Sequence, residues 1–135
     1  MKTTMVRIGW ICLAIVSAGI LVFGLVIAIV PMGGDELLYR ADGLASIGFG
    51  LFGGLIVLLP YRRAERWAWG ALWFYPVFWA AHLFGSLPPG TDHIHQIVFI
   101  VLSLIGLLLP VRVFFPSGQD RHAVESARPT GDGDL

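Results

Sequence analysis

The stretch Pro60-Tyr61-Arg62-Arg63-Ala64-Glu65-Arg66-Trp67-Ala68-Trp69 lies between two long apolar halves of the chain. It holds three arginines within five residues, and tyrosine and tryptophan flank them. Loops that carry clustered basic residues beside interfacial aromatic residues are typical of the cytoplasmic face of membrane proteins. We therefore expect the chain to turn at the cytoplasmic surface here, with Arg62, Arg63 and Arg66 as a topology anchor.

The composition supports this interpretation. Of the 135 residues, 56% are hydrophobic and 13% are charged, whereas about a quarter of the residues of soluble domains are charged. This balance predicts an integral protein of the cell membrane, in contact with the lipid bilayer. The formal net charge is zero, so no basic surface for nucleic acid is expected. Cys12 is the single cysteine, which excludes an intramolecular disulfide and a thiolate zinc site.

Four apolar segments flank the arginine-rich turn, two on each side: residues 8–30, 36–59, 68–87 and 94–115. Each has about the 20 residues that a helix needs to cross the hydrocarbon layer. We expect the first segment to be retained, because its apolar core is longer than that of a signal peptide. The four segments are predicted to form one transmembrane domain over residues 1–116. The polar residues 117–135 are predicted to form a disordered cytoplasmic tail.

The basic residues are divided unevenly between the two sides of such a bundle. With the N-terminus inside, one side carries Lys2, Arg7, Arg62, Arg63, Arg66, Arg112, Arg121 and Arg128, and the other carries only Arg40. This excess predicts that both termini are cytoplasmic. The expected fold is an all-α membrane protein, a multi-pass antiparallel bundle of four transmembrane helices.

Two short patterns occur twice. Pro-x-Gly-x-Asp occupies residues 31–35 and 88–92, and Leu-Leu-Pro-x-Arg occupies residues 58–62 and 108–112. One interpretation is that two helical hairpins of the same design repeat in parallel orientation. The alternative is chance similarity, because proline and glycine are common at turns and helix ends.

The second segment has features of a helix that packs closely. Asp35 is placed to cap its start, and Glu36 and Arg40 have the spacing of a helical ion pair. Small residues recur on one face of this segment at Ser46, Gly50 and Gly54. In a bilayer such a face lets a neighbouring backbone approach closely. We expect it to pack within the bundle, and formation of a homo-oligomer through it is the alternative.

Two ionisable residues are candidates for function at the non-cytoplasmic end. His82 lies in the third segment, which Pro76 is expected to kink, and at that depth a histidine should face the bundle interior or a wet cavity. The structural alternative is a neutral histidine that bonds to a carbonyl, to Ser46 or to Tyr75. Asp42 lies near the edge of the hydrocarbon. It is expected to pair with Arg40 or cap a turn, and proton transfer is the alternative.

Asp92, His93 and His95 form a second candidate group. Together with His82 they supply imidazole and carboxylate ligands that zinc or copper accepts. His93 and His95 point apart on a helix, however, and converge only if that segment is extended. The simplest interpretation is that the two are solvated loop residues. Two imidazoles on adjacent helices can also hold a haem, but the sequence does not by itself call for a cofactor, and it leaves a metal undecided.

Two known kinds of four-span membrane protein need residues that this chain lacks. Small multidrug transporters use an acidic residue in the first helix, and residues 8–30 contain none. Quinone-linked thiol oxidoreductases of the vitamin K epoxide type need cysteine pairs. The chain resembles the small uncharacterised prokaryotic four-helix membrane proteins grouped as DoxX-like, in size, in span number, in Arg40-Ala41-Asp42-Gly43 and in Tyr61 to Trp69. That resemblance assigns no residue a role.

Three function classes remain. The leading interpretation is a non-catalytic accessory or scaffold subunit that associates with other membrane subunits. The second is a small-molecule or proton-coupled carrier that uses His82 and Asp42. The third is a metal- or haem-binding membrane redox protein that uses the histidines and Asp92. An enzyme is thus not the favoured class.

Overall fold

The computed structural model describes residues 2–30, 35–85 and 93–116. Within these ranges the chain is helical and contains no strand, so the prediction of an all-α protein is confirmed. The elements are α1 (Lys2–Ile29), α2 (Glu36–Ile56), the π-helix η1 (Val57–Tyr61), α3 (Arg66–Leu72), α4 (Phe74–Gly85), α5 (Ile94–Leu108) and α6 (Val111–Phe114). The predicted tail over 117–135 lies outside the described residues.

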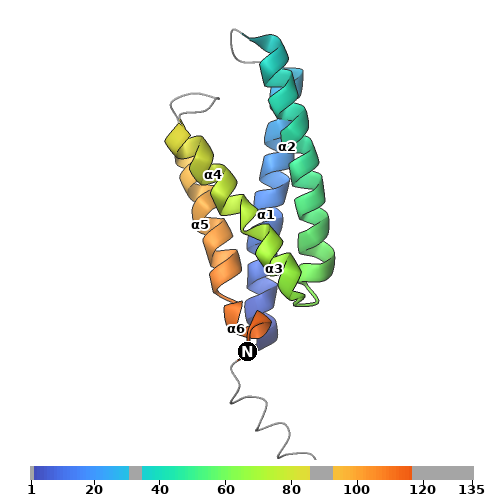
Figure 1. Cartoon of the computed structure of the whole chain (residues 1–135), viewed down its shortest axis with the longest axis vertical. Helices are drawn as coiled ribbons and strands as arrows, with labels where there is room; N and C mark the ends of the chain where they lie inside the picture. Colours follow the sequence, from blue (N-terminus) through green and yellow to red (C-terminus); the bar gives the residue numbers. More distant parts are fainter. Residues whose placement is uncertain (1, 31–34, 86–92, 117–135) are drawn as a thin grey trace, which may run out of the picture.

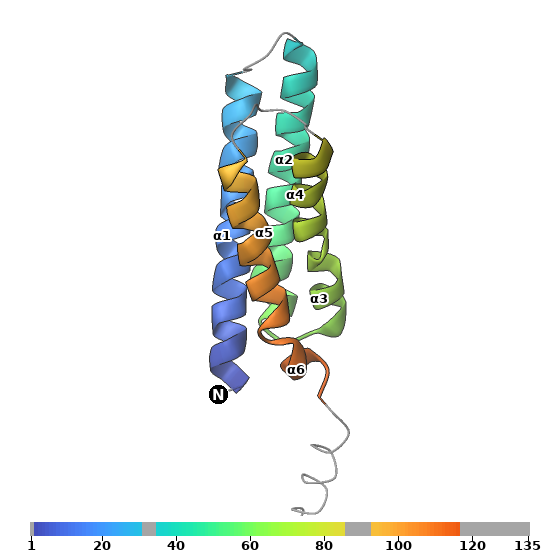
Figure 2. The ribbon, with the colours of Figure 1, turned by 90° about the vertical axis from the view of Figure 1, so that its left-hand side faces the viewer.

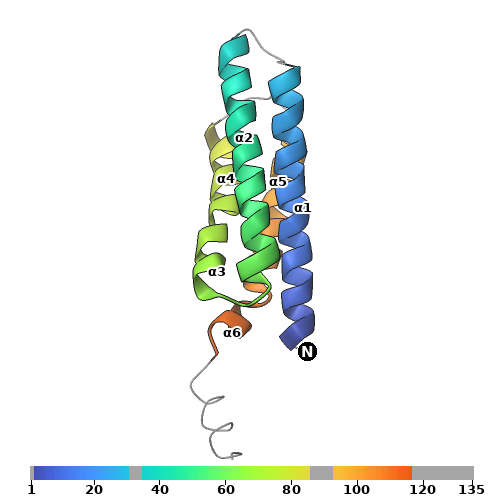
Figure 3. The ribbon, with the colours of Figure 1, turned by 90° about the vertical axis from the view of Figure 1, so that its right-hand side faces the viewer.

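The long helices lie roughly along one axis (Figure 1). The start of α1, the turn with Arg62 and Arg63, and α6 lie at one end, which we call the arginine end. The end of α4 and the start of α5 lie toward the opposite end, which we call the histidine end. Helices α1 and α2 run side by side (Figure 3) and extend beyond α4 and α5 at the histidine end (Figure 2).

Within the described residues, three helical segments are long and apolar enough to cross a membrane: Thr4–Ile29, Glu36–Tyr61 and Ile94–Phe114. Large apolar side chains are exposed on the outside of these segments; Phe52 is 72% exposed and Val22 is 58% exposed. Exposed apolar area of this extent is unfavourable in water but not in hydrocarbon. The three segments are therefore consistent with a membrane protein.

The predicted third span, residues 68–87, is interrupted at one residue ahead of Pro76, where a kink was expected. The structure divides it into α3 and α4, with the break at Trp73, and residues 86 and 87 lie outside the described part. The cause is Pro76, which has no N–H for the carbonyl of Leu72 and whose ring crowds that carbonyl. The Trp73 N–H instead bonds to the Gly70 oxygen at 3.3 Å, which closes the last turn of α3 tightly.

Proline also shapes the two helix ends at the arginine end. Pro60 lies inside η1 and has no N–H to donate. In π-helical bonding the N–H of the next residue, Tyr61, donates in its place. Pro110 ends α5 and precedes α6. Both copies of Leu-Leu-Pro-x-Arg thus lie where a long helix finishes. Residues 31–34 and 88–92 of the other repeated pattern lie outside the described residues.

Ala64 closes the helix that ends at the arginine turn. Its φ of 58° is the one positive value among the described non-glycine residues. The Glu65 N–H bonds to the Pro60 oxygen at 3.1 Å, and the Ala64 N–H bonds to the Tyr61 oxygen at 2.9 Å. This pair of bonds is the Schellman motif, which requires a left-handed residue at the position of Ala64. The turn is therefore closed by backbone bonds and not by its side chains.

Close backbone approach joins α1 to α2. A methyl group added at Gly43 would lie 2.6 Å from the Ala28 nitrogen, and one added at Gly50 would lie 2.8 Å from the Leu21 nitrogen. Ser46 is buried on the same face of α2. Gly54 is only half-buried, and a methyl group there would have ordinary contact with Ser17, at 3.7 Å. The tightest part of the interface thus includes Gly43, toward the histidine end.

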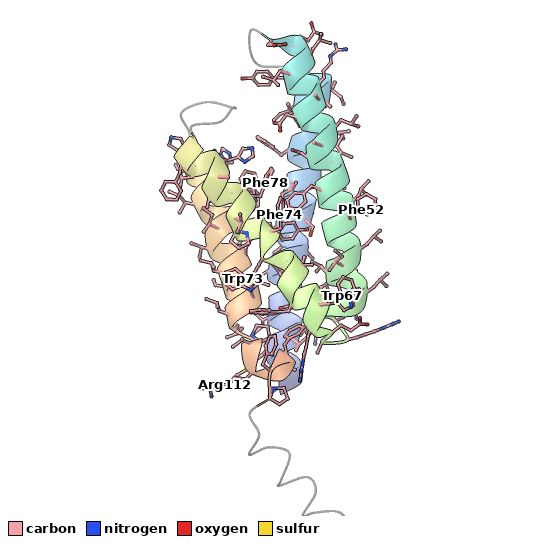
Figure 4. The ribbon with its side chains drawn as sticks, in the orientation of Figure 1. Phe52, Trp67, Trp73, Phe74, Phe78 and Arg112 are labelled. Carbon is pink, nitrogen blue, oxygen red and sulfur yellow. The ribbon has the colours of Figure 1, made fainter. Side chains whose placement is uncertain are left out.

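Aromatic rings fill the space between α2 and α4. The Phe49 ring lies 4.9 Å from Phe74, 5.1 Å from Tyr75 and 5.0 Å from Phe78, measured between ring centroids. Figure 4 shows Phe74 and Phe78 directed from α4 toward the neighbouring helices. The hydroxyl oxygens of Tyr75 and Ser17 lie 2.5 Å apart, which joins α4 to α1. This layer positions α4, and with it His82.

Candidate functional site

His82 faces the interior of the bundle from the last turn of α4. It is 7% exposed, and its Nδ1 lies 3.0 Å from the carbonyl oxygen of Phe78. Because a carbonyl can only accept, Nδ1 carries the hydrogen, and Nε2 is an acceptor in the neutral ring. The ring also lies 4.2 Å from the Phe78 ring. Of the bonds expected from the sequence, the structure contains the one to a carbonyl.

His95 lies in the first turns of α5 and reaches the same region. Its ring centroid is 5.7 Å from that of Phe23 on α1 and 5.9 Å from that of Trp79 on α4. The side chain is half-buried, and its Nε2 is buried without a hydrogen-bond partner. His95 is therefore a contact point of three helices and not a solvated loop residue.

Trp79 lies between the two histidines. Its ring centroid is 5.8 Å from His82 and 5.9 Å from His95, and it stacks on Phe99 at 5.0 Å. The residue is 1% exposed, and its Nε1 is a second buried nitrogen without a hydrogen-bond partner. An unpaired buried donor costs about 1–3 kcal/mol. We call His82, Trp79 and His95 the Trp79 cluster.

His93 has a different partner. It precedes the first residue of α5, and its Nδ1 lies 3.0 Å from Oε1 of Gln96. Gln96 is 1% exposed, and sequence reasoning did not select it. The signal that could have found it is its place one turn beyond His93, inside an apolar helix. Asp92 lies outside the described residues.

Asp42 is not part of the Trp79 cluster. It is half-buried on α2 and makes no hydrogen bond or ion pair within the described part of the chain. The expected pairing with Arg40 is absent there, because Arg40 donates to Oε1 of Glu36 one helical turn earlier. The expectation that Asp35 caps α2 is confirmed: its Oδ1 accepts from the Leu38 N–H at 3.2 Å.

A metal site is not assembled by the candidate ligands that the structure describes. Over residues 2–30, 35–85 and 93–116, no three side chains of histidine, cysteine, aspartate or glutamate come close enough to hold an ion. His82 and His95 each lie against Trp79, and His93 is bonded to Gln96. What the geometry offers is a pair of histidines around an indole, with two nitrogens left to bind a further polar group.

The arginines of the central turn differ in their contacts. Arg66 donates from Nε to the Phe114 oxygen at 3.1 Å, which ties the turn to α6. Arg62 lies over the Trp10 ring, with its Cζ 5.0 Å from the ring centroid. Arg63 is exposed. One of the three therefore supports the fold directly, and two keep donors available.

Comparison with known proteins adds no assignment: no family model, no curated protein and no solved structure matches the chain.

Proposed function

We propose that the chain is a small multi-pass membrane protein, an antiparallel four-helix bundle with both termini in the cytoplasm. Its proposed role is that of a non-catalytic accessory or scaffold subunit that binds another membrane protein. In this arrangement α3 and α4 together make the third crossing. The division of basic residues between the two ends supports the orientation.

The observation that carries the accessory role is an open notch on the outer face of α2. A methyl group added at Gly48 would meet no atom within 4 Å. One helical turn to either side, Leu44 is 69% and Phe52 is 72% exposed, and Figure 4 shows Phe52 directed away from the bundle. A small residue between two large ones gives a helix surface into which a partner helix can pack.

The interior supports the same role. Two of its polar contacts join helices: the Tyr75 and Ser17 hydroxyls lie within hydrogen-bond distance, and the Trp69 Nε1 donates to the Leu107 oxygen at 2.8 Å. Ser103 donates to the Phe99 oxygen within its own helix. Such bonds hold a bundle together and supply no reacting group, which favours a structural use of these interior side chains.

The test is a comparison of two glycine variants in native membranes. Gly48→Leu fills the notch, and Gly70→Leu places the same side chain at another glycine whose added methyl would meet no atom within 4 Å. We expect a stoichiometric membrane partner to co-purify with the wild type and with Gly70→Leu, and to be lost with Gly48→Leu. Equal retention by both variants would contradict the proposal. A complex that contains copies of this chain alone would replace the accessory role by self-association.

A second candidate is a carrier of protons or of a small polar molecule, and the Trp79 cluster favours it. The unpaired Trp79 Nε1 can donate to such a molecule, and the unpaired His95 Nε2 can accept from it or donate to it. If this candidate is correct, His95→Ala and His82→Ala should each abolish substrate-dependent flux into proteoliposomes. Variants of both residues that transport at the wild-type rate would exclude it.

A further inference from the structure

A hollow of about 640 Å³ opens at the arginine end between α1, the central turn and α6. Its lining includes Arg7, Arg62 and Arg63, together with Val6, Trp10 and Val113. All three arginines are exposed, and none makes an ion pair with a residue in the described ranges. Three guanidinium groups thus border one concave surface, and no carboxylate among the described residues lines it.

The surrounding contacts keep these groups available. The guanidinium of Arg62 lies over the face of the Trp10 ring. This contact leaves the N–H groups at the edge of the guanidinium free to donate. Arg66, by contrast, is bonded to the Phe114 oxygen and does not line the hollow. Arg66 therefore has a structural role, whereas Arg62 and Arg63 keep donors free.

The nearest described carboxylate is engaged elsewhere. Oε2 of Glu65 accepts from Trp67 Nε1 at 2.6 Å. Glu65 does not line the 640 Å³ hollow. The other described carboxylates are those of Asp35, Glu36 and Asp42 at the start of α2, at the opposite end of the molecule. Among the residues that the structure describes, the lining of the 640 Å³ hollow therefore carries positive charge alone, although the chain is neutral overall.

A second, apolar hollow adjoins the first. It has a volume of about 310 Å³ and is lined by Leu55, Ile56, Leu59, Pro60, Glu65 and Trp67, and Arg63 borders both hollows. The carboxylate of Glu65 in this lining accepts from Trp67 Nε1. Leu55 is 53% and Leu59 is 55% exposed, on the outer face of α2 and η1. Arg63 thus lies between the charged hollow and a mostly apolar one, and the apolar one borders a helix long enough to span a membrane.

We propose that these joined hollows bind one anionic phospholipid. Arg7, Arg62 and Arg63 take the phosphate-containing headgroup, and an acyl chain lies along Leu55 and Leu59. Arginine suits this ligand because its planar fork donates two parallel hydrogen bonds to a phosphate. Basic pockets beside transmembrane helices bind anionic headgroups in the same way. The inference depends on the proposed membrane insertion, but not on the accessory role.

The test is native mass spectrometry of the full chain in detergent, with phosphatidylglycerol and phosphatidylcholine of identical acyl chains. We expect one molecule of phosphatidylglycerol to be retained in preference to phosphatidylcholine. Arg62→Gln and Arg63→Gln should each weaken this binding about fivefold, which is the contribution of one basic residue near an anionic lipid. Arg112→Gln is the matched control, because Arg112 is exposed at the same end but does not line the hollow (Figure 4).

Two further arms identify the source of the phosphate. Glycerol phosphate in large excess should not displace the lipid, and Leu55→Ala with Leu59→Ala should weaken binding while the preference for the anionic headgroup remains. Equal retention of the two lipids, or equal loss in Arg112→Gln and Arg62→Gln, would overturn the proposal. Displacement by glycerol phosphate would overturn the lipid as occupant. Carbonate extraction of native membranes separately tests membrane insertion, so failure of the lipid site and failure of the proposed topology are distinguishable.

Discussion

The Tyr61 hydroxyl donates to the backbone oxygen of Gly106, the residue four positions before Pro110. In an uninterrupted helix that oxygen would accept from the N–H of residue 110, and proline has none. Tyr61, the last residue of η1, thus supplies to the end of α5 the donor that Pro110 lacks. Tyr61 is fully buried, so no bulk water can replace the bond.

Tyr61→Phe should lower the free energy of unfolding by about 1–3 kcal/mol, because it leaves a buried carbonyl without a donor. Tyr39→Phe is the control, because the Tyr39 side chain is half-buried and has no hydrogen bond among the described residues. The free energy of unfolding of each variant is measured by reversible unfolding of the protein in mild-detergent micelles as a denaturing detergent is added. In a Pro110→Ala background residue 110 regains its N–H, and the cost of Tyr61→Phe should shrink. An unchanged cost would show that the Gly106 oxygen is not the relevant partner.

Ala64→Gly should stabilise the chain by about 0.5–1 kcal/mol. A left-handed alanine costs about 1–2 kcal/mol, part of which glycine loses again through its larger unfolded-state entropy. The measurement is the same unfolding assay. Ala71→Gly, in the exposed face of α3, should instead destabilise by about 1 kcal/mol. If both variants destabilise equally, Ala64 does not adopt the left-handed conformation.

The long helices and the arginine-rich turn could be predicted from the sequence. Apolar length located α1, α2 and α5, and clustered arginine located the turn between Tyr61 and Arg66. Sequence could not predict the break at Trp73. Proline at position 76 predicts that the helix is disturbed, but it does not fix the residue at which the interruption falls.

The candidate site was predicted less well, because its contacts are between helices. His82 was selected correctly as a residue of the interior, since an ionisable residue at that depth needs a protein environment. The position of Trp79 between His82 and His95 depends on the rotation of α4 against α5, which no local pattern encodes. Gln96 was missed although its place one turn beyond His93, inside an apolar helix, is a local signal.

Gly43→Ala should destabilise the contact between α1 and α2. Its added methyl would lie 2.6 Å from the Ala28 nitrogen, and backbone atoms cannot move aside without separating the helices. We expect a loss of about 1–3 kcal/mol, as for overpacked interiors. Gly48→Ala is the matched control on the same helix, and with no atom within 4 Å it should be neutral or slightly stabilising. Similar losses in the two variants would contradict this account of the interface.

His95→Phe should be tolerated better than Trp79→Ala. Phenylalanine keeps the ring contacts with Phe23 and Trp79 and removes the unpaired Nε2, so the free energy of unfolding should stay within about 1 kcal/mol of wild type. Trp79→Ala removes a fully buried ring and should cost about 3–5 kcal/mol. Strong destabilisation by His95→Phe would indicate that a bound polar molecule normally satisfies Nε2.

The central claim is that the chain crosses the membrane four times, with α3 and α4 together as the third crossing. Single cysteines at Glu36, Arg63 and Arg112, all exposed, in a Cys12→Ser background, test it through labelling of intact cells by an impermeant thiol reagent. The account predicts that the cysteine at position 36 is labelled from outside, while those at 63 and 112 react only after the cells are opened. Labelling of positions 63 and 112 from opposite sides would show that α3 and α4 do not cross, and would contradict the four-span bundle.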